Sequence, residues 1–386
     1  MTARFPLATS SWDAEEYRAL TRVVASDMFS MGAEVRTFEE QFAAFFGAKF
    51  AVMVNSGSSA NLLMTAALFF TKTPHLARGD EIIVPAVSWS TTYFPLAQYG
   101  LHLKFVDVDR ATLNYDLDAL AAAVTDRTRA IMCVNLLGNP NDFAAIEGII
   151  GGRDITLIED NCESMGATFQ GEQCGTFGVM GTYSAFFSHH ISTMEGGLVV
   201  TDDEELYHVM LSLRAHGWTR NLPKFNHVTG EKSDDPFEES FRFVLPGYNL
   251  RPLEMSGALG QAQLKKLPGL ITGRRANGAL VQEALTDHPL FTIQKEIGES
   301  SWFGFSLVLR EDAGMDRSAL VQKLQAAGFE CRPIVAGNFT KNEVMRHIDH
   351  SIHGNLPNAD YIDRNGLFVG NHHYPIPEAV AALKAI

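Results

Sequence analysis

Short apolar runs rich in β-prone residues recur along the first part of the chain and alternate with stretches of helical periodicity. The runs lie at residues 49–55, 80–87, 102–109, 130–138, 155–160, 181–187 and 197–203. Several are apolar at consecutive positions, which is typical of strands buried on both faces. Apolar residues at helical spacing fill the gaps, for example at 58–70 and 117–129. This alternation predicts an α/β fold in which helices cover both sides of a mainly parallel sheet.

The pattern changes in the second half of the chain. A long helix is predicted near residues 245–267, followed by a strand at 302–309, a helix at 318–328 and a strand-like run at 330–335. A chain of 386 residues is longer than one hydrophobic core usually serves. We therefore expect a large domain at 1–250, with an N-terminal helical segment, and a smaller α+β domain at 251–386.

Residues 219–240 differ from the rest of the chain in composition. They are polar, rich in charge and weakly periodic, so a long surface excursion is expected there. Long loops of this kind in compact proteins are often functional.

Charge and cysteine usage narrow the class of protein. A formal net charge of −14 argues against a nucleic-acid partner, because phosphate binding requires clustered Lys and Arg. No apolar run could span a bilayer, and the N-terminus lacks an apolar signal core, so no membrane association or secretion is expected. A reducing cytoplasm is the expected location, because the four cysteines form no CxxC pair: Cys133, Cys162, Cys174 and Cys331.

The stretch VNSGSSANLL, residues 54–63, leads from a predicted strand into a predicted helix through Gly57, Ser58 and Ser59. Free backbone N–H groups at a helix N-terminus, together with hydroxyls, suit a phosphate group. An ordinary serine N-cap explains the same residues.

A second candidate stretch, LIEDNCESMG at 157–166, places Glu159 and Asp160 at the end of an apolar strand, with Glu163 three residues later. A carboxylate at the carboxyl end of a parallel strand points into the crevice where α/β proteins bind ligands. It can hold a protonated ring nitrogen through a charge-assisted hydrogen bond. The alternative is an aspartate that caps a helix.

Several motifs together carry a family resemblance that covers nearly the whole chain. GSSAN, SWSTTYF, EDNCES, SAFFSHH, MEGG and GYNLRPLEMSGALGQAQLKKL resemble the sugar-modifying aminotransferases of fold type I, which use pyridoxal 5′-phosphate (PLP). In that family a serine stands five residues before the lysine that binds PLP covalently, and a Gly-Gly pair begins seven residues after it. Counting from Ser184 and from Gly196 leads to the same position, which is His189. His190 is the second candidate.

Histidine at this position changes the expected chemistry. Imidazole is not a primary amine, so it cannot form the covalent link to PLP. With an ordinary pKa of about 6.5, it can still act as a base and then as an acid at neutral pH. Histidine here is the mark of the sugar 3-dehydratase branch of the family, to which SHHISTMEGG, ECRPIVAGNFTKNEVM and LFVGNHHY are also similar.

The resemblance implies non-covalent PLP and pyridoxamine 5′-phosphate (PMP) as cofactors. It implies a nucleotide-linked 4-keto-6-deoxy sugar as substrate, with GDP inferred from overall likeness, and glutamate as the amine donor that yields 2-oxoglutarate. A related branch that acts on CDP-sugars requires an iron–sulfur cluster. The widely spaced cysteines offer no ligand set for such a cluster, so none is expected.

Roles around the cofactor ring follow from the same resemblance. Asp160 would bind the pyridine nitrogen, Glu163 would lie near the ring hydroxyl, and Trp89 would stack on the ring. Glu163 departs from the Gln or His that is common among the aminotransferases. The phosphate would be held by Gly57, Ser58 and Ser184.

Asn249, within GYNLR, would reach the phosphate from a partner subunit. The resemblance therefore implies a homodimer with shared active sites. His216, Arg220 and Arg251 are further candidates near the substrate, because guanidinium groups bind phosphates bidentately. A loop histidine bonded to a carbonyl and surface salt bridges are the competing explanations.

Other chemistry is weakly supported. Adjacent histidines on an extended segment point to opposite faces, and HExxH spacing is missing, so no metal site is expected. His372 and His373 face the site or merely end a strand. Two alternatives to a dehydratase remain: an aminotransferase whose lysine is replaced by His189, and a non-catalytic relative that lost its activity with the lysine.

Overall fold

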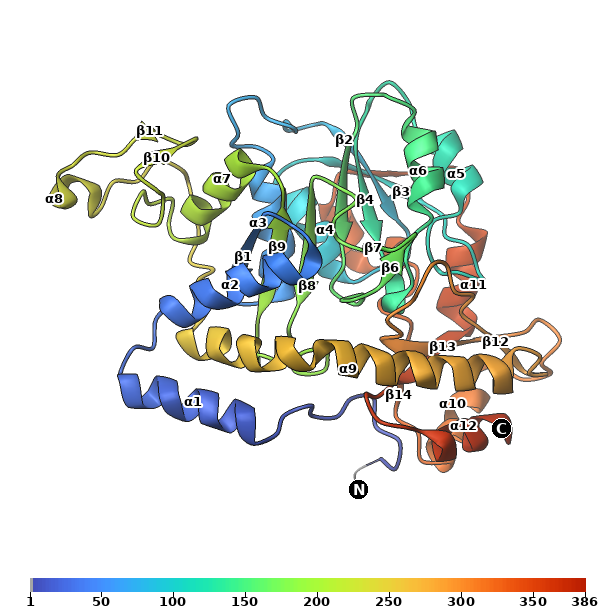
Figure 1. Ribbon diagram of the computed structural model, residues 1–386. Helices are drawn as coiled ribbons and strands as arrows, with labels where there is room; N and C mark the ends of the chain where they lie inside the picture. Colours follow the sequence, from blue (N-terminus) through green and yellow to red (C-terminus); the bar gives the residue numbers. More distant parts are fainter. Residues whose placement is uncertain (1–2) are drawn as a thin grey trace.

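An eight-stranded mixed sheet forms the centre of the fold in the computed structural model, which describes residues 3–386 (Figure 1). The first two residues of the expected large domain lie outside the described residues. The strand order is β1-β9-β8-β5-β4-β2-β3-β15, and only β9 runs against its neighbours. The strands are β1 (Phe50–Val54), β2 (Glu81–Pro85), β3 (His102–Val106), β4 (Thr128–Val134), β5 (Thr156–Asp160), β8 (Met180–Ser184), β9 (Gly197–Thr201) and β15 (His350–Ile352). All but β15 coincide with the predicted apolar runs, so the predicted α/β fold is confirmed.

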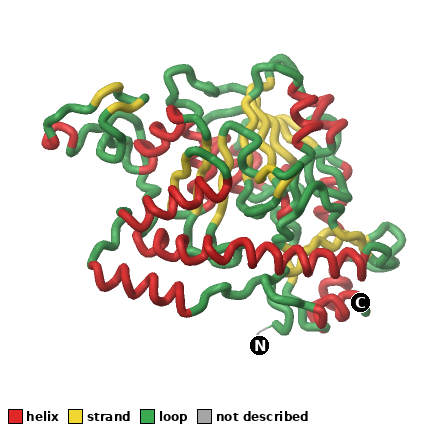
Figure 2. Tube along the Cα trace, in the orientation of Figure 1, coloured by secondary structure: helices red, strands yellow, loops and turns green. Residues whose placement is uncertain are grey.

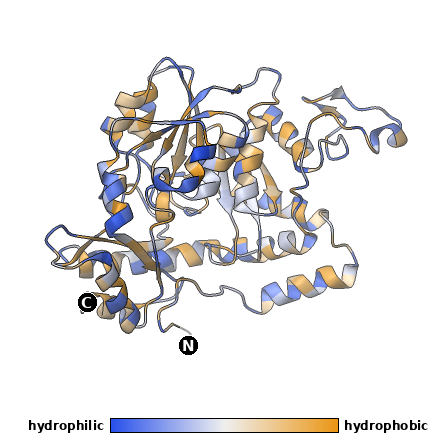
Figure 3. Cartoon of the chain, turned by 180° about the vertical axis from the view of Figure 1, so that it is seen from behind, coloured by the Kyte–Doolittle hydropathy of each residue, from blue (hydrophilic) through white to orange (hydrophobic). Residues whose placement is uncertain are grey.

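Helices cover both faces of this sheet because alternate side chains of each strand enter different cores. Ile82 and Val84 of β2 pack with one set of helices, whereas Ile83 packs with another. The first set is α3 (Gly57–Ala67), α4 (Ser90–Gln98) and α7 (Glu204–Arg214); the second is α5 (Leu117–Ala123) and α6 (Phe143–Ile150). The tube view shows the strands enclosed between helices, and the hydropathy view shows apolar colours on the strands in the interior (Figures 2 and 3).

The longest helix, α9 (Glu254–Leu285), runs along one side of the molecule and joins the two parts of the chain (Figure 1). It begins after Pro252 and continues through Pro268, well beyond the predicted end at 267. It packs against α1 (Ala14–Ser26) and α2 (Ala33–Phe46). The approach to α2 requires glycine, because a Cβ atom at Gly260 would lie 2.4 Å from the Phe38 ring.

The C-terminal part builds a four-stranded sheet in the order β12-β13-β16-β14. The predicted strand at 302–309 and helix at 318–328 are present, whereas the run at 330–335 contributes only a two-residue strand. Its strands are β12 (Phe291–Ile293), β13 (Gly304–Leu309), β14 (Cys331–Arg332) and β16 (Gly366–Gly370); its helices are α10 (Arg317–Ala326), α11 (Pro357–Asn365) and α12 (Pro377–Lys384). The short strand β15 lies in the range expected for the small domain but pairs in parallel with β3 of the large sheet. The boundary between residues 250 and 251 stays a prediction.

The polar excursion projects from the body, as the sequence predicts, and carries short elements of its own (Figure 1). We call residues 219–243 the arm. It contains β10 (Phe225–Asn226), β11 (Gly230–Glu231) and α8 (Pro236–Glu239). Elsewhere β6 (Thr168–Phe169) pairs with β7 (Glu172–Gln173), and 3-10 turns lie at η1 (Leu136–Gly138), η2 (Phe339–Lys341) and η3 (Glu343–His347). Within residues 3–386, no helix combines the length and the apolar character needed to cross a bilayer.

Candidate active site

The carboxyl ends of the central strands surround a cavity of about 340 Å³. Strand β5 ends at Asp160, β8 ends at Ser184, and β1 leads through Ser56 into α3. This is the position where open α/β sheets bind their ligands. Seven of the residues expected from the sequence line this one cavity: Gly57, Ser58, Trp89, Asp160, Glu163, Ser184 and His189.

Asp160 is held in a fixed orientation at the cavity wall. Its side chain is buried, and Oδ2 accepts hydrogen bonds from Asn61 Nδ2 at 2.8 Å and from Thr92 Oγ1 at 2.7 Å. Oδ1 accepts from the backbone N–H of Cys162 at 3.2 Å. A carboxylate so positioned can accept a further hydrogen bond from a protonated ring nitrogen in the cavity.

The first turn of α3 lies at the cavity, where the sequence predicts an anion-binding site. Ser56, rather than Ser58, is the N-cap, and its side chain accepts a hydrogen bond from the Ser59 N–H at 3.1 Å. The serine N-cap is therefore present at Ser56, and Gly57 and Ser58 line the cavity, where phosphate binding stays a prediction. A Cβ atom at Gly57 would lie 2.7 Å from Ser184 Cβ, so glycine lets the positive end of the helix approach strand β8.

Glu163 lies beside Asp160, and its Oε2 accepts a hydrogen bond from the Leu137 N–H at 3.0 Å. Burial raises the pKa of Glu163 to about 7, and the neighbouring Asp160 acts in the same direction. At neutral pH this carboxyl group is therefore able to donate as well as accept a hydrogen bond.

His189 lies at the cavity, whereas His190 does not. The His190 side chain is buried, with Nε2 3.2 Å from the carbonyl oxygen of Ser301. Burial, assisted by the positive charge of Arg274, lowers the pKa of His189 to about 4. The His189 imidazole is therefore a neutral base at physiological pH, and the geometry favours it over its neighbour as the chemical group.

The residues at this cavity fit PLP. A buried carboxylate stands ready for the ring nitrogen, a helix N-terminus for the phosphate, and the indole of Trp89, which is 56% exposed, for the face of the ring. None of the described residues that line the cavity is a lysine. The lining also includes Cys162, Glu195 and Val335, which the sequence reasoning did not identify.

The other expected site residues gather elsewhere in the chain, around Trp218. The ring of His216 lies 4.8 Å from that indole, and the guanidinium carbons of Arg220 and Arg251 lie 4.5 and 5.8 Å from it. Asn249 accepts a hydrogen bond from Arg251 Nε at 3.0 Å. This Trp218 cluster lies outside the lining of the chain's own cavity.

His372 is tied to the N-terminal segment. Its Nδ1 lies 3.1 Å from Thr9 Oγ1, and its Nε2 lies 3.1 Å from the carbonyl oxygen of Pro6. Neither His372 nor His373 lines the cavity, so the explanation that they follow a strand, here β16, is the one that the structure favours. Among residues 3–386, no group of three His, Cys, Asp or Glu side chains is arranged to hold a metal ion.

Comparisons with known proteins agree with these features. Residues 10–381 match the DegT/DnrJ/EryC1/StrS aminotransferase family. The chain is 62% identical over 380 residues to GDP-4-keto-6-deoxy-D-mannose 3-dehydratase of Yersinia pseudotuberculosis, with 98% of this chain and 97% of the relative covered. A solved structure of a histidine-to-asparagine variant of GDP-4-keto-6-deoxymannose-3-dehydratase with bound GDP-perosamine has a TM-score of 0.98, 62% identity and 99% coverage of both chains. A structure of that enzyme with a trapped PLP-glutamate geminal diamine has the same identity, TM-score and coverage.

Proposed function

Because the chain belongs to the DegT/DnrJ/EryC1/StrS aminotransferase family, we propose that it uses PLP and PMP to remove a hydroxyl group from a nucleotide-linked sugar. The substrate is GDP-4-keto-6-deoxy-D-mannose, and the hydroxyl leaves from carbon 3. Glutamate is the amine donor, and ammonia is released. The observation that carries the proposal is His189, an imidazole at a PLP-shaped cavity to which the described residues contribute no lysine.

When bound, PMP supplies a primary amine for the 4-keto carbon and a conjugated ring that passes electrons toward carbon 3, and glutamate restores the amine. The chain holds this cofactor without a covalent bond. Gly57, Ser58 and Ser184 bind its phosphate, Trp89 covers the ring, and Asp160 keeps the ring nitrogen protonated. These contacts matter more here than in a lysine enzyme, because no covalent bond retains the cofactor.

His189 moves the protons. As a neutral base it takes a proton from carbon 4′ of the cofactor, and as an acid it returns that proton to the oxygen that leaves sugar carbon 3. The low pKa of the imidazole suits this second role, since a weakly basic group releases its proton readily. Glu163 bonds the ring hydroxyl, and its raised pKa lets it do so in either protonation state.

Product analysis tests the function. We expect the protein, supplied with PLP, glutamate and GDP-4-keto-6-deoxy-D-mannose, to yield equal amounts of ammonia, 2-oxoglutarate and a 4-keto-3,6-dideoxy sugar nucleotide. The variant His189→Ala is expected to lose about 10²-fold to 10⁴-fold of this rate and to retain PLP. An aminosugar formed without ammonia would identify an aminotransferase instead. A cofactor whose aldehyde absorption persists after addition of glutamate would identify a non-catalytic relative.

The same proposal includes a homodimer whose subunits complete each other's sites. Its support is the Trp218 cluster, which gathers Asn249 and two arginines away from the chain's own cavity. Beside that cluster, Phe241 and Phe243 are 68% and 57% exposed, and contiguous exposed aromatic surface is typical of interfaces.

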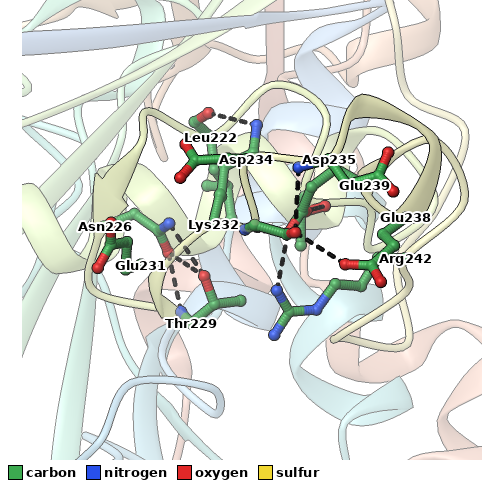
Figure 4. A network of polar contacts seen from close by, with 12 residues as sticks. Leu222, Asn226, Thr229, Glu231, Lys232, Asp234, Asp235, Glu238, Glu239 and Arg242 are labelled. Atoms are coloured by element: carbon green, nitrogen blue, oxygen red, sulfur yellow. Dashed lines mark hydrogen bonds and ion pairs between the residues drawn. The ribbon is translucent and has the colours of Figure 1, made fainter.

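The arm is internally braced, which suits a preformed interface. Figure 4 shows its polar network, in which Glu239 accepts a hydrogen bond from Arg242 Nη1 at 2.9 Å. Glu239 also accepts a hydrogen bond from the Ser233 N–H at 2.8 Å. Lys232 Nζ donates to the carbonyl oxygen of Leu222 at 3.0 Å. A segment that holds its shape while it projects loses little conformational entropy on docking.

Subunit complementation tests the shared site. The variants His189→Ala and Asn249→Asp are each expected to be inactive alone. When the two variants are co-expressed and pair at random, about half of the dimers are mixed. In each mixed dimer one of the two sites has both His189 and Asn249 intact, so about a quarter of wild-type activity returns. No recovery in a sample that sedimentation shows to contain mixed dimers would reject the shared site.

A cytoplasmic location completes the proposal. All four cysteines are free thiols in the structure, which supports a reducing compartment. Fractionation of cells that produce the protein, followed by detection with an antibody, tests it, and recovery in a secreted fraction would refute it.

A further inference from the structure

A short segment of the C-terminal part, residues 300–303, is pinned to the turn η1 beside the active site. Ser300 Oγ and the Ser301 N–H both donate to the carbonyl oxygen of Gly138, at 2.8 and 2.9 Å. The Phe303 N–H donates to the carbonyl oxygen of Leu137 at 2.9 Å. Since the N–H of Leu137 binds Glu163, this one turn connects the segment to a side chain of the cavity.

The same segment contacts both histidines of the SHHISTMEGG motif, His189 and His190. The Ser301 carbonyl oxygen lies 3.2 Å from His190 Nε2. The ring of Phe303 lies 5.0 Å from the His189 ring, at an interplanar angle of 61°, and 5.9 Å from the His190 ring. Phe303 is half-buried and is not among the residues that line the cavity, so it contacts the His189 ring on a side that does not face the cavity.

Arg274 of α9 holds this segment from the other side. Its Nη1 donates to the carbonyl oxygens of Phe303 and Asn371, each at 3.1 Å, and to that of Trp302 at 3.4 Å. The guanidinium is buried, and within residues 3–386 its hydrogen bonds go to carbonyl oxygens and none to a carboxylate. A buried cation that binds three carbonyl groups is a costly arrangement, which indicates that the backbone it fixes is important.

Backbone strain marks both sides of the contact. Leu137 has a φ of 54° and Trp302 a φ of 47°, the left-handed region that non-glycine residues rarely adopt. The turn η1 and the segment 300–303 also approach closely, since a Cβ atom at Gly138 would lie 2.6 Å from the Trp302 backbone nitrogen. Such conformations persist only when the surrounding contacts enforce them.

The imidazole of His189 needs such support, because its polar anchoring is weak. The hydrogen bond that the described residues give its ring is a 3.5 Å contact between Nδ1 and Ser188 Oγ. Catalytic histidines are commonly oriented by a carboxylate or a backbone carbonyl that binds one ring nitrogen. Here the ring is bounded by aromatic edges, those of Phe303 and, at 5.9 Å, Phe186.

We propose that Phe303 is a positioning residue that sets the orientation of the His189 imidazole, and that residues 300–303 couple this orientation to the turn that binds Glu163. This inference rests on the proposed role of His189 in proton transfer. Because Phe303 touches His189 and not the cavity, its loss affects the proton transfers and leaves cofactor binding unchanged. The aromatic contact also keeps the imidazole free of a carboxylate, which would raise the pKa of His189 and weaken it as an acid.

The test compares Phe303→Leu with Phe291→Leu. Phe291 is a buried phenylalanine on β12 of the C-terminal sheet, and its ring stacks on His288. For Phe303→Leu we expect kcat to fall about tenfold or more, with KM for the sugar nucleotide and Kd for PLP within about twofold of wild type. Phe291→Leu loses more thermal stability, because it is fully buried, but keeps its kcat.

Crystal structures of the cofactor-free variants supply a readout that does not depend on turnover. In Phe303→Leu the His189 ring is expected to rotate or to occupy more than one orientation, whereas in Phe291→Leu it stays as in wild type. An unmoved imidazole in Phe303→Leu, an unchanged kcat, or an equal loss of kcat in both variants would overturn the inference. Failure of the proposed function is distinguishable, because the wild-type protein itself would then form no dideoxy product.

Discussion

Gly57→Ala tests the close packing beneath the phosphate cup. A Cβ atom at this position would lie 2.7 Å from Ser184 Cβ and 3.0 Å from both Ser184 Oγ and Cys162 Sγ. Carbon atoms in favourable contact are about 3.5 to 4.0 Å apart, so either the first turn of α3 or the end of β8 must move. Both of those elements are proposed to bind the cofactor phosphate.

The magnitude follows from two opposing effects. Overpacking in a dense interior costs about 1 to 3 kcal/mol, whereas replacing a helical glycine by alanine gains up to about 1 kcal/mol. A net cost between about 0 and 3 kcal/mol remains, with a central value of about 1.5 kcal/mol. If displacement of Ser184 removes a similar amount from phosphate binding, Kd for PLP rises about tenfold, since a factor of ten corresponds to about 1.4 kcal/mol.

The assay is direct because no covalent bond holds the cofactor. PLP is titrated into the cofactor-free protein while its absorption is followed, and thermal unfolding is measured in parallel. The matched control is Gly269→Ala on α9, where an added Cβ atom meets nothing within 4 Å. The control should bind PLP as wild type does and melt at the same or a higher temperature. If Gly57→Ala also binds PLP with an unchanged Kd, the proposed role of this turn is refuted.

Three further changes probe the ring side of the cavity. Burial raises the pKa of Glu163 from 4.5 to about 7, so the folded, cofactor-free protein retains a proton that the unfolded chain releases, and stability falls as pH rises through that window. In Glu163→Gln the free energy of unfolding, measured between about pH 4.5 and 7, should fall less steeply, by up to about 3 kcal/mol over this range. An unchanged pH profile would contradict the raised pKa of Glu163. Thr92→Val removes the 2.7 Å donor to Asp160, and Kd for PLP should rise about tenfold, whereas an unchanged Kd would show that this carboxylate needs no such support. His189→Lys supplies a primary amine at the cavity, so treatment with borohydride should link the cofactor covalently to that residue. Mass spectrometry should detect this adduct in the variant and no adduct at position 189 in the wild type.

The sequence predicts the fold well where a run of apolar residues along the chain coincides with a buried strand. Consecutive apolar residues in β2, Ile82 to Val84, and in β9, Leu198 to Val200, are buried at every position, so the pattern and the environment agree. Strand β15 escaped notice because its three residues, His350 to Ile352, are too short to show any periodicity. Its pairing with β3 depends on tertiary structure alone.

The cofactor cavity was equally accessible from the sequence, since its residues follow strand ends within continuous motifs. Seven predicted residues meet there, and the family resemblance implied the position of His189 through the spacing from Ser184 and Gly196. Phe303 and Arg274 could not be found in this way. They reach the site through contacts between segments far apart in sequence, and the left-handed φ of Leu137 and Trp302 has no signature in the residue types.

The origin of β15 near the end of the chain has a consequence for biosynthesis. Strand β3 (His102–Val106) leaves the ribosome well before residues 350–352, which cover its outer edge. Until β15 emerges, the nascent chain therefore carries a strand with unsatisfied N–H and C=O groups, which is a template for aggregation. Prematurely terminated chains keep that edge open for good, and we expect chaperones or proteases to intercept them.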